Sequence, residues 1–526
     1  MARQRWGSKL GIILAVAGSA VGLGNFLRFP GQAAANGGGS FLIPYFIMLF
    51  LVGIPLMWIE WTIGRFGGGF DHSTAPGMFH CMCEKNRFVK YFGVIGIFGP
   101  IVIFVYYTYI ESWLLGYSCF ALAGSYNGCR DLNAMAGFLG SYLGQNDAGH
   151  FHGIWLAYLF FVLTFAANMV IVYYGIRGGI ERVCKIALPI LLLFAVVLMV
   201  RVFTLGTPDP AKPENSVSKG LGFLYNIDLS QITKAKVWLA AAGQIFFTLS
   251  VGIGVILTYA SYLRKNDDVA LSGLTAASAN EVAEVILGGS IVIPAAYAFG
   301  ASGMMASPSG GSSFDLGFKT MPLVLQQMAG GGVFGFLWFA LLFLAGVTSS
   351  ISLAQPAIAF LEDEFDFSRR KATVVFGIVT FLLCQAVLFG PGVLGEMDFW
   401  GGNLCLVVFA CVEVVLFAWV FGMDRAWTEL HAGSDIRIPR LYRFVIKYVT
   451  PLALFVILGS WLYQEGLTTI LFRDVKAGDP ALAWRILTRV GLLGLFLVLL
   501  VLVWIAWRRR GGQTKHSENG APNHEA

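Results

Sequence analysis

Charged residues are scarce in this sequence of 526 residues. Asp, Glu, Lys and Arg together make up 13% of it, and hydrophobic residues make up 57%. An average soluble domain has about 25% charged residues, so the composition excludes a soluble globular protein and predicts one embedded in a lipid bilayer. The sequence also lacks stretches of about ten residues with alternating hydrophobicity, which excludes an outer-membrane β-barrel.

Residues that usually carry catalysis or hold transition metals are scarce too. The chain has seven histidines and eight cysteines, and the cysteines show no metal-site spacing. No nucleophile has a base at a workable spacing within the apolar segments, so we expect no enzymatic activity. The net charge of +6 follows membrane topology, and we expect no nucleic-acid partner. A disulfide between Cys119 and Cys129 is left open.

Long apolar segments dominate what is present. A membrane-spanning helix needs roughly 20 mostly apolar residues, and such segments number about twelve. They lie near residues 9–34, 39–64, 88–122, 155–173, 179–203, 236–261, 271–300, 332–361, 371–389, 396–421, 443–464 and 482–507. We therefore predict an all-α integral membrane protein with about twelve transmembrane helices.

The placement of basic residues predicts the orientation. Arg and Lys concentrate before the first span, after the last span and in every second connection between them. By the positive-inside rule these segments face the cytoplasm. Both termini, residues 1–8 and 508–526, are therefore expected there, and the polar tail 508–526 is expected to be disordered.

Two of the apolar segments are interrupted by glycine. Residues 18–25 read Gly-Ser-Ala-Val-Gly-Leu-Gly-Asn and residues 248–254 read Thr-Leu-Ser-Val-Gly-Ile-Gly, so both contain Val-Gly-(Leu/Ile)-Gly. At this depth, backbone outside a helix is tolerated only where protein buries it or where it lines a polar site. Matched interruptions in two halves of a chain point to the binding site of a secondary transporter.

A broken helix suits a zwitterion and a hard cation together. The free N–H groups that begin its second half attract a carboxylate, and the free C=O groups that end its first half attract a cation. Hard cations take oxygen ligands, which Asn25, Thr248, Asn280 and the hydroxyls of residues 348–350 could complete. Taken singly, such residues more often pack helices or bond their own backbone. Their convergence with two matched breaks favours a site.

Longer motifs carry a family resemblance. They are Gly-Ser-Ala-Val-Gly-Leu-Gly-Asn-Phe-Leu-Arg-Phe-Pro (18–30), Ile-Pro-Leu-Met-Trp-Ile-Glu-Trp (54–61), Gln-Ile-Phe-Phe-Thr-Leu-Ser (244–250), Glu-Val-Ile-Leu-Gly-Gly-Ser (284–290) and Glu-Met-Asp-Phe-Trp (396–400). From Arg3 to about residue 508 the chain resembles the neurotransmitter:sodium symporters, and among them the bacterial leucine transporter. The resemblance implies the LeuT-like fold, a five-plus-five inverted repeat over 9–203 and 236–421 with two further helices in 443–507. It also implies a bacterial inner (plasma) membrane.

The resemblance also implies two sodium ions and an amino acid as ligands, bound and released by alternating access. The first sodium would be held by the Ala20 carbonyl, Asn25, Thr248, Asn280 and the substrate carboxylate. The second would be held by the carbonyls of Gly18, Val21 and Ala345 and the hydroxyls of Thr348 and Ser349. The substrate would be contacted by Ser19, Ala20, Gly22, Leu23, Gly24, Ile103, Tyr107, Phe247, Thr248, Ser250, Ile253, Ser349 and Leu353.

Gly22 and Glu284 refine what the resemblance implies. Monoamine transporters of this family carry aspartate at the Gly22 position, so glycine implies a substrate that brings its own carboxylate. Glu284 stands where chloride-dependent members have a small hydroxyl residue, which implies chloride independence. Because the side-chain pocket is aliphatic, we expect neutral hydrophobic L-amino acids, with leucine, methionine or alanine ahead of aromatic ones.

Two charge pairs resemble the family's gates. Arg28 and Asp398 correspond to the outer pair, with Tyr107 and Phe247 as a lid over the substrate. The inner pair would be Arg3 and Asp363.

Other functions stay open from the sequence. A proton-coupled amino acid transporter or a non-transporting amino acid sensor would fit the same fold, and a channel is a further alternative. The sequence also leaves undecided the preferred amino acid, proton counter-transport and whether the protein forms a homodimer.

Overall fold

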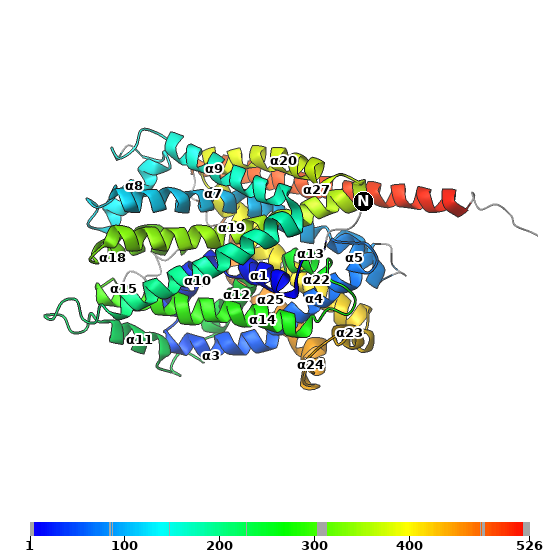
Figure 1. Ribbon diagram of the computed structural model, residues 1–526, viewed down its shortest axis with the longest axis horizontal. Coiled ribbons are helices and arrows are strands. Elements are labelled where there is room, and N and C mark those ends of the chain that lie inside the picture. Colours follow the sequence, from blue (N-terminus) through cyan, green and yellow to red (C-terminus); the bar gives the residue numbers. More distant parts are fainter. Residues whose placement is uncertain are drawn as a thin grey trace, which may run out of the picture.

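The computed structural model describes residues 5–83, 86, 88–146, 148–227, 229–301, 313–473, 475 and 479–518. Within these ranges the secondary structure is helical, with no strand. Figure 1 shows long helices packed side by side along the long axis of the molecule. The all-α architecture predicted from the composition is therefore confirmed.

The helices coincide with the apolar segments. The first five spans are formed by α1 (Lys9–Ala20) with η1 (Gly24–Arg28) and α2 (Phe29–Ala35); α3 (Gly39–Met48), η2 (Leu49–Gly53) and α4 (Ile54–Gly68); α6 (Val89–Phe92) and α7 (Ile95–Ala123); α9 (Trp155–Tyr173); and η3 (Ile176–Ile180) with α10 (Glu181–Phe203). The next five are formed by α12 (Ala235–Leu249) and α13 (Val255–Ala260); α14 (Ala270–Glu281), η4 (Val282–Gly288) and α15 (Gly289–Ala298); α19 (Gly331–Phe365); α20 (Arg369–Phe389); and α21 (Val393–Met397), η6 (Asp398–Cys405), α22 (Leu406–Val415) and η7 (Leu416–Val420). The last two are α24 (Leu441–Phe444), η8 (Val445–Val449), α25 (Thr450–Trp461) and η9 (Leu462–Gly466), and then α27 (Ala481–Glu518).

Shorter helices connect the spans at the two ends of the bundle. They are α5 (Ala75–Met82), α8 (Leu132–Tyr142), α11 (Val217–Tyr225), α17 (Ser313–Asp315), η5 (Leu316–Thr320), α18 (Met321–Gln326), α23 (Met423–Leu430) and α26 (Leu467–Ile470). In Figure 1, α8, α11 and α18 lie at the left end, and α5 and α23 lie at the right. The N-terminus and the emerging end of α27 also lie at the right, so both ends of the chain leave the bundle on the same side.

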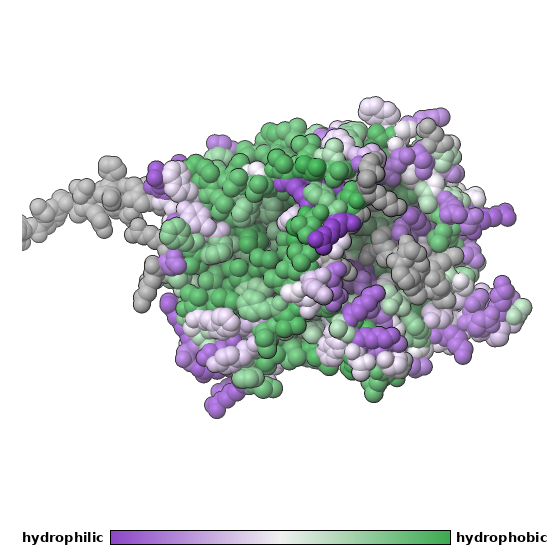
Figure 2. All heavy atoms as spheres, turned by 180° about the vertical axis from the view of Figure 1, so that it is seen from behind, coloured by the Kyte–Doolittle hydropathy of each residue, from purple (hydrophilic) through white to green (hydrophobic). Residues whose placement is uncertain are grey.

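Length and hydropathy support most of the predicted spans. In the described part of the chain, ten helices are long and apolar enough to cross a membrane, and an eleventh span is the bent pair of α1 with η1 and α2, at an angle of 44°. The sixth predicted span is divided between α12, a shorter apolar helix, and α13. Figure 2 shows a broad hydrophobic area between more hydrophilic ends, as contact with lipid requires.

The second half of the sixth span is held by close helix packing. A Cβ on Gly64 of α4 would lie 2.3 Å from the Leu257 carbonyl oxygen, and a Cβ on Gly68 would lie 2.1 Å from the Ser261 carbonyl oxygen. Two glycines four residues apart let the backbones of α4 and α13 touch, which is a common device for packing helices in membranes. The position of α13 is fixed in this way from one side.

Two details concern the chain outside the bundle core. Cys119 and Cys129 are both free thiols, so the disulfide left open by the sequence is absent from this structure. The helix α27 continues to Glu518 and so enters segment 508–526, for which disorder was predicted. Residues 519–526 lie outside the described part of the chain.

Candidate functional site

Both glycine motifs interrupt their helices, as predicted. The first helix ends at Ala20 and resumes at Gly24, and the other ends at Leu249 and resumes at Val255. A hydrogen bond joins the two glycine motifs. The Ser250 hydroxyl of the second motif donates to the Ser19 carbonyl oxygen of the first motif at 2.9 Å.

Side chains satisfy part of the backbone that the interruptions leave free. The Gly22 N–H donates to Asn25 Oδ1 at 2.9 Å, and the Gly252 N–H donates to Glu60 Oε1 at 2.6 Å. The Ser19 carbonyl oxygen accepts a second hydrogen bond, from Ser349 Oγ at 3.2 Å, in addition to the one from Ser250. Buried backbone groups need such partners in a membrane, so these polar residues stabilise the breaks, and Ser349 also lines the cavity between them.

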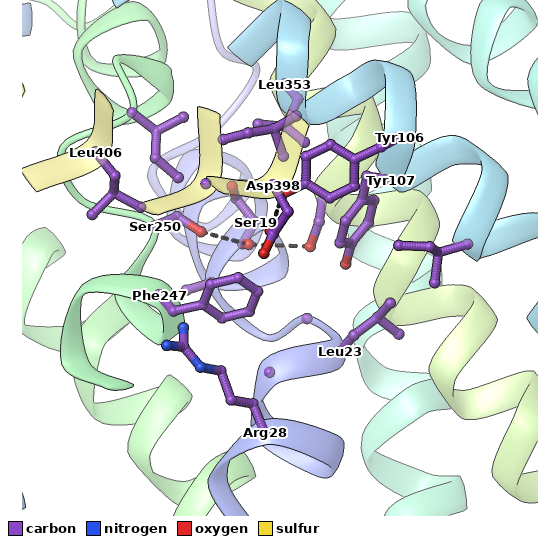
Figure 3. Close-up of a pocket in the computed structure, with 18 of the residues that line it drawn as sticks. Ser19, Leu23, Arg28, Tyr106, Tyr107, Phe247, Ser250, Leu353, Asp398 and Leu406 are labelled. Carbon is purple, nitrogen blue, oxygen red and sulfur yellow. Dashed lines mark hydrogen bonds between the residues drawn. The ribbon is translucent and has the colours of Figure 1, made fainter. Parts of the chain in front are cut away.

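A cavity of about 270 Å³ lies between the two interruptions and the helices α7 and α19 (Figure 3). Twelve of the thirteen residues predicted to contact substrate line it: Ser19, Ala20, Gly22, Leu23, Gly24, Ile103, Tyr107, Phe247, Ser250, Ile253, Ser349 and Leu353. The thirteenth, Thr248, is buried behind the wall and donates its hydroxyl to Glu284. The structure thus gathers segments more than 300 residues apart in sequence around one space.

Sequence reasoning missed several residues of this wall. They are Leu27, Tyr106, Ile110, Val255, Phe314, Gly402, Asn403 and Leu406. The helical period offered a signal for two of them, since Gly402 and Leu406 follow Asp398 by four and eight residues and so share its face. Nothing in the local sequence of Phe314 shows that it reaches the cavity.

The cavity has one apolar side and one polar side. Branched aliphatic side chains, including Ile103, Ile253 and Leu353, form the apolar side. The polar side consists of the broken backbone and uncharged hydroxyls, and a Cβ on Gly22 would lie 3.0 Å from Ser349 Oγ and 3.4 Å from the Tyr107 hydroxyl. Among the described residues that line the cavity, the charged ones are Arg28 and Asp398.

Arg28 and Asp398, the predicted outer pair, face the same cavity without touching. The Arg28 guanidinium carbon lies 4.6 Å from the centre of the Phe247 ring. Asp398 accepts hydrogen bonds from the Tyr106 hydroxyl at 2.8 Å and from Asn403 Nδ2 at 3.2 Å. Figure 3 shows the Phe247 ring between the guanidinium and the carboxylate, and no ion pair joins the two in the described part of the chain.

A second cavity continues from the first toward the surface. It measures about 360 Å³ and shares Arg28, Phe247 and Asn403 with the first cavity. It reaches Lys236 and Gln464, which are both exposed. The broken helices are thus accessible from the end of the bundle that carries α11, opposite the N-terminus (Figure 1).

Polar groups predicted for the first sodium site lie together. The terminal amide of Asn280 lies 2.8 Å from Asn25 Nδ2, 2.9 Å from Thr248 Oγ1 and 3.1 Å from the Ala20 carbonyl oxygen. Asn25 and Asn280 are fully buried, and Thr248 is almost so. Amide, hydroxyl and carbonyl oxygens are the donors that a hard cation prefers, so these residues fit sodium.

Glu284 lies directly beside this group. Its carboxylate accepts hydrogen bonds from the Thr248 hydroxyl and from Gln244 Nε2 at 2.5 Å, and the Asn280 amide lies 3.3 Å from it. The side chain is fully buried. A buried carboxylate requires compensating donors or a nearby cation, and here it shares its donors with the candidate sodium ligands.

Groups predicted for the second sodium site lie where α1 meets α19. Thr348 Oγ1 lies 3.1 Å from the Ala345 carbonyl oxygen, and Ser349 Oγ lies 3.0 Å from the same oxygen. A Cβ on Gly18 would lie 3.3 Å from the Thr348 Cβ, so the backbone of α1 lies directly against these hydroxyls. Val21 directly follows the end of α1 at this point. Five uncharged oxygen donors from two helices also fit sodium.

On the side of the N-terminus, Trp6 packs against α13. Trp6 Nε1 donates to the Tyr259 carbonyl at 2.9 Å, and the two rings meet edge to face. The predicted inner pair is only partly described: Asp363 accepts from the Ser73 N–H at 2.7 Å, whereas Arg3 lies outside the described residues.

Similar proteins support these expectations. An uncharacterized sodium-dependent transporter of Methanocaldococcus jannaschii is 29% identical over 460 residues, covering 86% of this chain and 89% of that protein. The sodium-dependent dopamine transporter of Bos taurus is 26% identical over 508 residues, covering 87% and 69%. The crystal structure of MhsT in complex with L-phenylalanine matches with a TM-score of 0.73 and 28% identity, covering 87% of this chain and 99% of that one.

The structural match agrees with the LeuT-like fold predicted from the sequence. The relatives are named as sodium-dependent transporters, which confirms that the chain is not an enzyme. The model of the sodium:neurotransmitter symporter family matches residues 3–136 and 147–503. This protein therefore belongs to the sodium:neurotransmitter symporter family and is a multi-pass, sodium-dependent membrane transporter.

Proposed function

We propose that the protein couples sodium to the transport of neutral hydrophobic L-amino acids. The observation that carries the proposal is the division of the cavity into an uncharged polar side at the helix breaks and an aliphatic side opposite. The N–H groups at the start of η1 favour a carboxylate. Among the described residues, the groups nearest to Gly22 are the uncharged Ser349 and Tyr107 hydroxyls, so an amine alone would find no acidic partner there. A zwitterion with an apolar side chain matches both sides.

The size of the side chain is the finer part of this proposal. Ile103, Ile253 and Leu353 form an aliphatic wall, which favours leucine, methionine or alanine over aromatic amino acids. MhsT is a relative whose structure holds L-phenylalanine, so phenylalanine is the informative competitor. An aliphatic wall discriminates by only about 1–3 kcal/mol per methylene, and the expected preference is therefore graded.

Two sodium ions are proposed, one for each cluster of oxygen donors. Ala20, Asn25, Thr248 and Asn280 would hold the first together with the substrate carboxylate. Gly18, Val21, Ala345, Thr348 and Ser349 would hold the second. Bound sodium supplies positive charge against which the substrate carboxylate and the free carbonyls of α1 are stabilised, and the membrane potential adds roughly 2.3 kcal/mol per charge at 100 mV.

Chloride independence follows from Glu284 in this proposal. Its carboxylate contacts Thr248 and Asn280 and therefore supplies a fixed negative charge beside the first sodium. A mobile anion would then be redundant. Replacing chloride by gluconate should leave transport unchanged in the wild type, whereas Glu284→Ser should transport only when chloride is present.

Alternating access would use the two ends of the cavity. The path past Arg28, Phe247 and Asn403 is open, while Trp6 packs against α13 on the side of the N-terminus. Approach of Arg28 to Asp398 would close the outer path, and separation of the residues around Asp363 would open the inner one. With both termini in the cytoplasm of a bacterial inner membrane, the open path faces outward.

The test is uptake of radiolabelled leucine into proteoliposomes with an inward sodium gradient, against matched potassium. Sodium-driven accumulation supports the symporter. Uptake that follows a proton gradient without sodium would favour a proton-coupled transporter. Sodium-dependent binding without uptake, in vesicles where a known carrier is active, would favour a non-transporting sensor. Equal competition by lysine or glutamate would overturn the substrate class.

A further inference from the structure

A third cavity lies on the outer surface of the bundle, away from the transport site. It is a groove of about 620 Å³ between α9 and α20, which lie side by side (Figure 1). Its lining is mainly apolar and aromatic, with Phe165, Ile378 and Phe381 among its residues, and its polar groups are the hydroxyls of Thr373, Tyr173 and Tyr174. Gly377 lets the two helices approach closely here, since a Cβ at that position would lie 3.1 Å from Met169 Sδ.

The length of the groove matches one leaflet of a bilayer. Its lining runs from residue 165 to 174 on α9 and from 373 to 382 on α20. At about 1.5 Å per residue this is roughly 14 Å, or half of a hydrocarbon core of about 30 Å. One end lies near the middle of the bundle and the other lies where α20 begins, on the side of the chain termini.

The Thr373 hydroxyl is buried in the wall of the groove. Thr373 is 3% exposed, and its Oγ1 has no hydrogen-bond partner among the described residues. Thr380 lies about two turns further along α20, and its hydroxyl donates to the Phe376 carbonyl at 2.8 Å. An unsatisfied buried hydroxyl costs free energy. Rotation of the Thr373 side chain toward the groove would give its hydroxyl an acceptor on an occupant, about one turn below the charged end of that occupant.

Positive charge lies at the end of the groove near the chain termini. Arg370 is exposed and its guanidinium carbon lies 5.5 Å from the centre of the Tyr173 ring, which lines the groove. Lys371 beside it is also exposed. The neighbouring Arg369 is instead occupied by Glu362, at 3.2 Å. Two exposed cations therefore meet the membrane surface at this end.

We propose that this groove binds an anionic glycerophospholipid of the leaflet next to the chain termini. An acyl chain would occupy the apolar length, an ester carbonyl would accept from Thr373, and the phosphate would lie against Arg370 and Lys371. Basic residues near the membrane surface attract anionic lipids. The apolar lining and the Thr373 hydroxyl would serve any glycerophospholipid, so the charge gives the selectivity.

Native mass spectrometry of the full-length protein in detergent tests the proposal. Phosphatidylglycerol and phosphatidylcholine with identical acyl chains are titrated separately, and the retained lipids are counted. We expect one phosphatidylglycerol to be retained at least about tenfold more tightly than phosphatidylcholine. Arg370→Gln with Lys371→Gln should abolish that preference, while the matched pair Arg437→Gln with Arg440→Gln, also exposed, should keep it.

The role of the Thr373 hydroxyl is tested separately by an isosteric substitution. Thr373→Val should weaken both lipids severalfold and leave their ratio unchanged, whereas Thr380→Val should not weaken either. Equal binding of the two lipids by the wild type, or an unaltered preference in the Arg370 and Lys371 variant, would overturn the proposal. A disulfide between two copies of Ile378→Cys in membranes would also overturn it, because a second copy of the chain would then cover the groove.

Discussion

The two helix breaks share a sequence motif but use their glycines differently. In the second break, Gly252 and Gly254 adopt φ angles of 74° and 91°, a region that L side chains rarely enter. In the first break, Gly22 and Gly24 have negative φ angles, which any L-residue can adopt. There the missing side chain leaves space: a Cβ on Gly24 would lie 2.7 Å from the Phe247 ring.

The difference separates a structural role from a binding role. Glycine in the second break sets the direction of the backbone, and Glu60 then holds that backbone through the Gly252 N–H. Glycine in the first break keeps the cavity open where a substrate would meet backbone. One motif therefore predicts two breaks, and replacing its glycines should have different consequences in each.

The largest effect is expected at Gly254. A Cβ there would lie 2.5 Å from the Gly96 carbonyl oxygen, and the φ of 91° is unfavourable for alanine in any case. Gly254→Ala should therefore lower the yield of folded, monodisperse protein strongly, as measured by size-exclusion chromatography and thermal melting in detergent. Gly459→Ala is the control, since nothing lies within 4 Å of a Cβ at that position. Equal yields of the two variants would contradict the structural role.

Gly22→Ala is expected to act on binding instead. The added methyl group would lie 3.0 Å from Ser349 Oγ and 3.4 Å from the Tyr107 hydroxyl, and the hydroxyls can move by a few tenths of an ångström. Overpacking of this kind costs about 1–3 kcal/mol. Folding should be retained, while leucine affinity falls roughly 10- to 100-fold. A melting temperature lowered as far as in Gly254→Ala would erase the contrast between the breaks.

The same contrast shows what the sequence could predict. Both breaks and the polar residues near them were predictable, because glycine pairs and isolated amides in an apolar segment are local signals. The wall of the cavity was less predictable, because Phe314 reaches it only where helices distant in sequence pack together. Thr248 was predicted to contact substrate, but its hydroxyl is turned to Glu284, a choice that depends on a partner in another helix.

The two threonines of the proposed sodium sites should have unequal effects. Thr248→Val removes an oxygen ligand and a donor to buried Glu284, whereas Thr348→Val removes a hydroxyl that otherwise bonds only carbonyls of its own helix. A lost bond to a charged group is worth about 1.5–3 kcal/mol and a neutral one about 1 kcal/mol. The sodium concentration for half-maximal leucine uptake should therefore rise more than tenfold in Thr248→Val and roughly fivefold in Thr348→Val. A Hill coefficient that falls from near two toward one in both variants would support two ions, and an unchanged coefficient would contradict them.

The smallest effect is expected at Ser250, which belongs to the second break without being glycine. Its φ is 54°, and its hydroxyl donates to the Ser19 carbonyl at 2.9 Å. Ser250→Ala loses the bond, about 1 kcal/mol, and keeps a backbone that costs an L-residue roughly 1–2 kcal/mol. Ser250→Gly loses the same bond but escapes the backbone cost.

Glycine should therefore leave the protein about 1 kcal/mol more stable than alanine does, as reported by thermal melting of the two variants side by side. If alanine is the more stable of the two, left-handed backbone is not what the second break demands. Its glycines would then have to be explained by close packing, as in the first break. Equal loss of leucine binding in both variants would show, independently of stability, that the hydrogen bond from Ser250 to Ser19 shapes the cavity where the two breaks meet.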